Sequence, residues 1–156
     1  MASITPKGLF NYLVRLLRVP RIVQLIHTAK GLNPFLPSFH IVETCGPSVG
    51  GQAFNKAQRI HVSSWILKNA SVAKGVVRHE LAHLIHSQIG TGGLPHGKEF
   101  KQVLKTIAPK TWRKDRTFRW EPEIVTAYTT IHPQKATSPR MLFIPFIATV
   151  HPTAVA

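Results

Sequence analysis

Two histidines and a glutamate near the middle of the chain have the spacing of a helical metal site. Residues 79–83 read H-E-L-A-H, an H-E-x-x-H pattern. On a helix, residues four apart lie one above the other, about 6 Å along the axis, so His79 and His83 can bind one cation through ring nitrogens. Glu80 lies about 100° around the helix from His79 and can reach a water on that cation. The pattern therefore predicts a zinc site in which the metal and Glu80 together activate a water for attack on a carbonyl.

A zinc site of this kind needs a third protein ligand and an open fourth position. His96 comes four residues before Phe100, so we expect it on the inward face of a second helix that opens near residue 95. The Gly-rich segment 90–93 predicts the turn that folds this helix back onto the first. Glu99 is the alternative ligand, but it points away from the apolar stripe of the second helix. We therefore favour His96 over Glu99.

The helix that carries the motif must begin near residue 70 and end near Gly90. Apolar residues recur at helical spacing on two sides of it, which is typical of a buried central helix rather than a surface helix. Asn69 or Ser71 can cap its start, and a glycine is a common helix end.

Upstream of this helix, three short alternating segments indicate strands, at residues 39–45, 52–56 and 59–63. Glycine and proline between the first two indicate a turn. The expected fold class is therefore α+β. A small antiparallel sheet packs on the active helix and on a second, ligand-bearing helix, and an N-terminal helical segment completes the fold.

These residues resemble the SprT-like metalloprotease domain family. The family pattern, H-E-L-x-H followed by H-G-x-x-F, is matched by residues 79–83 and 96–100. The Gly-rich segment 50–63 is similar to the turn and strand that precede the active helix in that family. The resemblance covers about residues 41–108.

The resemblance implies a ligand set and an activity. His79, His83 and His96 would bind one zinc ion, and Glu80 would be the catalytic base. The family includes DNA-dependent proteases that degrade proteins crosslinked to DNA, which implies protein substrates on nucleic acid. Many members also have a C-terminal zinc ribbon; this sequence has Cys45 as its single cysteine and cannot form a four-thiolate site.

The charge balance predicts a polyanionic partner. Lysine and arginine number 20 against 6 acidic residues, a formal net charge of +14. We expect nucleic acid, DNA before RNA, rather than a membrane. Basic groups neutralise phosphates and aromatic rings stack on bases; the alternative is that the aromatic rings anchor the core and the charges face water. The candidate nucleic-acid-binding residues are Lys110, Trp112, Arg113, Lys114, Arg116 and Arg119.

The length of 156 residues predicts a single domain, with a core at about 39–108 and a C-terminal extension, 109–156, that holds basic, aromatic and apolar segments.

Residues 1–40 contain no acid and have apolar positions at helical spacing, interrupted at Pro20. We expect helices packed on the core. The alternatives are a basic amphipathic face for DNA or membrane and an organelle transit segment. No apolar run approaches the length of a membrane span.

We therefore expect a zinc-dependent metallopeptidase that hydrolyses peptide bonds with a metal-activated water and acts on proteins, including proteins bound to nucleic acid. Tyr128, His132 or an arginine could stabilise the oxyanion. One alternative is a basic nucleic-acid-binding or assembly protein that keeps a zinc site for structure, and another is a zinc hydrolase of a non-peptide bond.

A lone cysteine fits a reducing compartment. The expected location is cytoplasmic or nucleic-acid-associated, with organelle import or a virus-encoded product as alternatives.

Overall fold

The computed structural model describes residues 2–30, 35–43, 45, 50–90, 92–116 and 146–147, with side chains described except at 28–30 and 146–147. The candidates Arg119, Tyr128 and His132 lie outside these residues. The elements, in chain order, are α1 (Pro6–Leu16), α2 (Pro20–Lys30), β1 (Ser38–Val42), β2 (Gly51–Phe54), β3 (Arg59–Ser63), the 3-10 helix η1 (Ser64–Lys68), α3 (Ala70–Ile89), α4 (Lys98–Ile107), α5 (Trp112–Arg116) and β4 (Phe146–Ile147). The predicted α+β class is confirmed.

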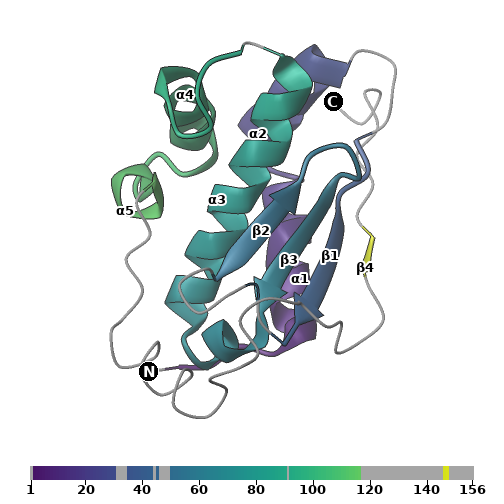
Figure 1. Ribbon diagram of the computed structural model, residues 1–156, viewed down its shortest axis with the longest axis vertical. Helices are drawn as coiled ribbons and strands as arrows, with labels where there is room; N and C mark the ends of the chain where they lie inside the picture. The colour runs from purple at the N-terminus through teal and green to yellow at the C-terminus, as the bar shows by residue number, and fades with distance from the viewer. Residues whose placement is uncertain are drawn as a thin grey trace.

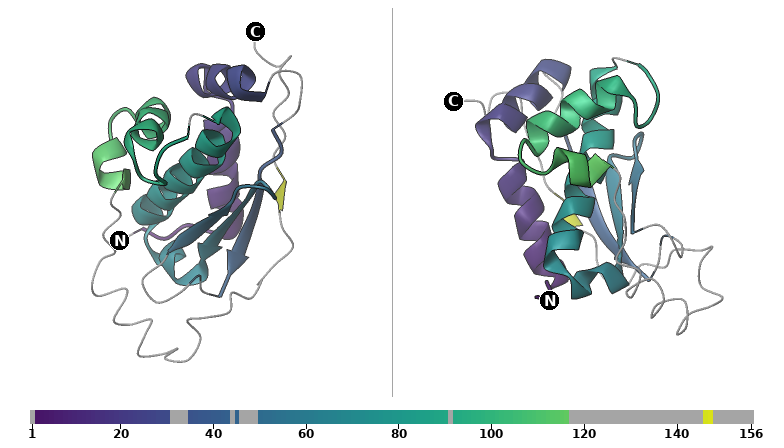
Figure 2. Two further views of the ribbon diagram at one scale, coloured as in Figure 1. Left: turned by 45° about the horizontal axis from the view of Figure 1, so that its top comes forward. Right: turned by 90° about the vertical axis from the view of Figure 1, so that its left-hand side faces the viewer.

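The long helix α3 lies at the centre of the fold. Figures 1 and 2 show the sheet on one side of α3, α4 and α5 on another, and α1 and α2 along a third. This explains the apolar residues on two sides of α3, since almost every other element packs on it. The Asn69 side chain caps the first turn by accepting from the Val72 N–H at 3.2 Å, and Gly90 ends the helix with a left-handed φ of 69°.

The sheet has the strand order β2-β3-β1-β4. β2 and β3 form an antiparallel hairpin, whereas β1 pairs with β3 in parallel, with Phe39 opposite Ile60. The expectation of a wholly antiparallel sheet was therefore wrong for this pair. The connection from Val42 to Gly51 is longer than the roughly two to five residues of a tight hairpin, and β3 inserts between β1 and β2. At the other edge, β4 pairs with β1, so this short part of the C-terminal apolar segment is extended along the sheet.

The N-terminal segment forms two helices that pack on the core. Thr5 caps α1 through its side-chain oxygen, and Pro20 is the first residue of α2, a position at which proline needs no N–H partner. The leucine, isoleucine, valine and phenylalanine side chains described in α1 and α2 are buried or half-buried, while Arg15, Arg18 and Arg21 are exposed. The interpretation of packed helices is confirmed for these residues. Within the part of the chain that the structure describes, no helix has the length and apolarity that a membrane crossing requires.

Candidate metal site

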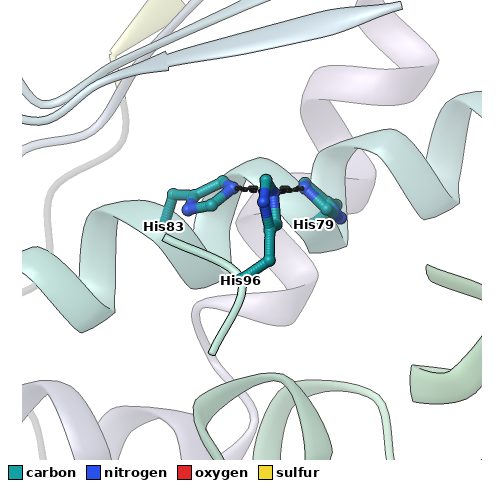
Figure 3. A group of neighbouring side chains, drawn as sticks. All are labelled: His79, His83 and His96. Carbon is teal, nitrogen blue, oxygen red and sulfur yellow. Dashed lines mark hydrogen bonds between the residues drawn. The ribbon is translucent and has the colours of Figure 1, made fainter. Parts of the chain in front are cut away.

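The structure brings the ring nitrogens of His79, His83 and His96 to one point (Figure 3). The three Nε2 atoms are separated by 3.2 Å (His79–His83), 3.2 Å (His79–His96) and 3.0 Å (His83–His96). A tetrahedral zinc with bonds of about 2.0–2.1 Å places its ligand nitrogens about 3.3 Å apart. The three nitrogens thus occupy three corners of a tetrahedron of the right size, and these side chains could hold one metal ion.

Two different local structures position these rings. His79 and His83 are one turn apart on α3, as the spacing predicts. His96 lies in the turn just before α4, which begins at Lys98, so it precedes the second helix instead of forming part of it. The turn needs glycine at Gly92 and Gly93, whose φ angles are 73° and 88°.

Phe100 supports all three rings from the first turn of α4. Its side chain is fully buried, and its ring stacks on His83 with centroids 4.4 Å apart and planes at 27°. Its centroid is also 5.2 Å from those of His79 and His96. The inward apolar face of α4 therefore anchors the turn and brings His96 against α3.

Burial favours the neutral, metal-binding form of the two rings on α3, His79 and His83. Desolvation, with smaller contributions from the neighbouring histidines, lowers the pKa of His83 to about 3. Desolvation also lowers the pKa of His79, whose Nδ1 lies 2.6 Å from the main-chain oxygen of Asp115. Because that carbonyl can only accept, Nδ1 carries the proton and Nε2 keeps its lone pair for the ion.

Glu80 is a buried carboxyl group beside the ligands. It is 8% exposed, and burial raises its pKa to about 8. The first residue of β2 packs directly against it: a methyl group placed on Gly51 would lie 3.1 Å from Glu80 Cγ. A carboxyl group whose pKa is near neutral pH is suited to accepting and releasing a proton at neutral pH.

The alternative ligand, Glu99, is not part of the cluster. Its carboxylate lies against Gly93, and Glu99 is not among the residues whose ligand atoms converge. His86, one turn beyond His83, directs Nε2 to the Gly92 carbonyl oxygen at 2.8 Å and so braces the same turn. Of the two candidates for third ligand, the structure therefore brings only His96 to the metal position.

The comparison with protein families agrees with this geometry. The model of the SprT-like family matches residues 36–121, more than half of the chain. The chain belongs to the SprT-like family. The matched range runs from β1 to beyond α5 and is wider than the motif alone indicates. Searches of curated proteins and of solved structures give no match. Membership of the SprT-like family suggests a metallopeptidase-like domain around the three histidines.

Of the residues proposed from the sequence to bind nucleic acid, all but Arg119 are described, and they lie on α5 and the turn before it. In this SprT-like chain Lys110, Arg113 and Lys114 are exposed and Arg116 is half-buried. Trp112 is half-buried and packs on the core, with Lys105 Nζ 4.5 Å and Arg113 Cζ 5.1 Å from its ring centroid. Its ring is therefore already in contact with two cations rather than open to a base.

Proposed function

We propose that this protein is a zinc-dependent endopeptidase that uses a water to hydrolyse peptide bonds. The observation that carries the proposal is the tetrahedral spacing of three imidazole nitrogens next to the buried Glu80. A ligand set of three imidazole nitrogens suits zinc. Zinc bound there leaves a position for water, lowers the pKa of that water and polarises a carbonyl.

In this proposal Glu80 handles the proton. It accepts a proton from the water as the water attacks the scissile carbonyl, and it donates that proton to the leaving amine. Burial raises the pKa of Glu80 to about 8 in the metal-free site, and a nearby dication lowers it, so the carboxylate form is available near neutrality.

The sheet offers a place for an extended substrate. β2 is at one end of the strand order, and its first residue contacts Val76 and Glu80 of α3. An extended peptide that pairs with the edge of β2 that no described strand occupies would run past Glu80, and main-chain pairing makes few demands on side chains.

Next to the metal position is room for a substrate side chain. A cavity of about 360 Å³ opens beside His83, between the β2–β3 turn, the end of α3 and the glycine-rich turn. Among the described residues, no carboxylate, lysine or arginine lines it, so it suits a neutral side chain next to the scissile bond. Its lining residues are Asn55, His83, His86, Ser87, Gly90, Gly92, Gly93 and Pro95.

The experiment that tests this function compares Glu80→Gln with the matched variant Glu99→Gln. Both remove one carboxylate from neighbouring parts of the fold, but only Glu80 is placed to move a proton. With zinc present and an unfolded protein such as reduced casein as substrate, Glu80→Gln should cut on the order of 10²–10⁴-fold more slowly at unchanged zinc content. Glu99→Gln should cut at nearly the parental rate. Equal cleavage by the parent and Glu80→Gln, or no cleavage by the parent, would contradict the proposal.

We also propose nucleic acid as a partner, because basic side chains are exposed on and next to α5. Lys110, Arg113 and Lys114 lie on the surface there, in a chain with a net charge of +14. Binding to single- and double-stranded DNA and to RNA of equal length should weaken steeply as salt rises, since each neutralised phosphate releases counterions. Replacing Arg113 and Lys114 by Gln should reduce the salt slope, and an affinity that does not respond to salt would rule out this partner.

A further inference from the structure

The short helix α5 is part of the environment of the metal site, although it lies outside the H-E-x-x-H motif. The main-chain oxygen of Asp115 accepts a hydrogen bond from His79 Nδ1 at 2.6 Å. This bond fixes both the tautomer and the rotation of the ring, and so the direction in which Nε2 points. The contacts that hold the Asp115 carbonyl in place therefore determine how well His79 Nε2 is oriented toward the ion.

The side chain of Asp115 links α5 to α3 through an ion pair and hydrogen bonds. Asp115 is fully buried, and its two carboxylate oxygens accept from Arg78 Nε at 2.6 Å and Arg78 Nη2 at 3.1 Å. Thr111 Oγ1 donates to the same carboxylate at 2.9 Å. Since Arg78 directly precedes His79 on α3, the ion pair and the carbonyl bond tie one residue of α5 to two successive residues of α3.

Arg78 also connects this network to a third helix, α1. Arg78 Nη1 donates to the Tyr12 hydroxyl of α1 at 2.8 Å. The carboxylate bonds of Asp115 go to Arg78 and Thr111, whereas the Tyr12 hydroxyl bonds to Arg78, so one branch of the network holds α5 and the other joins α1 to Arg78. A two-pronged bond between a guanidinium and a carboxylate fixes direction as well as distance, which an isolated charge pair does not do.

We propose that Asp115 is a positioning residue of the metal site, whose carboxylate, held by Arg78 and Thr111, fixes its own carbonyl against His79. This inference rests on the proposed metal site but not on peptidase activity. Asp115 acts through His79 and does not touch the ion or the substrate. Groups that hold a metal-binding histidine in this way commonly contribute about 10–100-fold to metal affinity.

The test measures zinc affinity of the full chain by competition with a chromogenic chelator, without any substrate. Asp115→Asn keeps the shape of the side chain but loses its charge, and it should weaken zinc binding about 10–100-fold. Thr111→Val removes one hydrogen bond and should weaken it several-fold. Tyr12→Phe is the matched control, because it removes a bond to Arg78 and leaves the α5 branch intact; it should bind zinc like the parent.

A second readout separates positioning from general stability. The ring nitrogen shifts of His79, measured by NMR on metal-free protein, should report a single Nδ1–H tautomer in the parent and Tyr12→Phe, and a mixture in Asp115→Asn. Parental zinc affinity in both Asp115→Asn and Thr111→Val would overturn the inference. If Asp115→Asn does not fold, Thr111→Val decides, and parental affinity there overturns it as well. A failed peptidase assay with these affinity differences intact would reject the activity and leave the inference standing.

Discussion

Replacing Glu80 by Gln is expected to remove a pH-dependent cost of folding from the metal-free protein. The carboxyl group is 8% exposed, and burial raises its pKa from 4.5 to about 8. Between these values the folded protein keeps a proton that the unfolded chain has released, so the free energy of unfolding falls as pH rises. The slope approaches about 1.4 kcal/mol per pH unit for one such group.

From about pH 5 to about pH 8 this slope amounts to a loss on the order of 3 kcal/mol. The histidines act in the opposite direction. Desolvation lowers the pKa values of His79 and His83, so below about pH 6.5 the unfolded chain binds protons that the folded protein does not, and stability rises with pH there. That contribution is common to the parent and Glu80→Gln. The difference between the two free energies of unfolding therefore gives the pH-dependent contribution of Glu80 alone.

The assay is urea unfolding of the parent and Glu80→Gln, in the presence of a chelator, at several pH values across this range. Because this range lies above the unfolded-state pKa of 4.5, the parent should lose stability relative to the variant throughout it as pH rises. Added zinc should reduce the difference, because a dication beside the carboxylate favours its charged form. A difference that is constant with pH would refute the reasoning, since it would show that Glu80 is not desolvated by the fold.

Three further substitutions, the last with a control variant, test the packing around the site by urea unfolding, and the second is also tested by zinc affinity. Gly51→Ala should destabilise the protein by about 1–3 kcal/mol, because the new methyl group would overlap with Val76, and an unchanged midpoint would show that β2 lies farther from α3. Phe100→Ala should cost about 3–5 kcal/mol and weaken zinc binding, and parental zinc affinity would show that the ring does not support the ligands. Asn69→Ala should cost about 1 kcal/mol by removing the cap of α3, whereas Ser71→Ala should cost little, and equal effects would contradict the assigned cap.

The parts of the site that depend on local spacing could be predicted from the sequence. His79 and His83 are one helical turn apart, so their approach follows from the helix alone. His96 lies close to the other two rings, as the prediction requires, but it belongs to a turn and not to the second helix, and Phe100 packs against it. Its role as a ligand stays a prediction. The approach of the His96 ring to the other two rings depends on the apolar face of the second helix, and the sequence does show that face.

The contact between α5 and the metal site could not be predicted, since it joins residues 36 positions apart through a main-chain oxygen, which every residue has. One signal was present. Asp115 is a single acid within a basic segment, and a lone acid there is a candidate for a buried ion pair. The segment 110–120 was interpreted either as a surface for nucleic acid or as aromatic core anchors with the charges in water, yet its one carboxylate is fully buried and paired with Arg78.

The strand positions followed from alternation, but their pairing did not. Alternation in residues 39–45 and 59–63 indicates which face is buried and says nothing about which strand lies next to which. The position of β3 between β1 and β2 is set by packing of the sheet on α3, which involves residues far apart in the chain.

The most direct measurement is the zinc content of the purified protein, determined by mass spectrometry of the metal for the parent, His96→Ala and His86→Ala. The three-imidazole site predicts about one zinc per chain in the parent and nearly as much in His86→Ala, whose ring braces the turn without joining the cluster. His96→Ala should retain far less. A parent without zinc, or a His96→Ala variant that keeps as much zinc as the parent, would contradict a site built from these three rings.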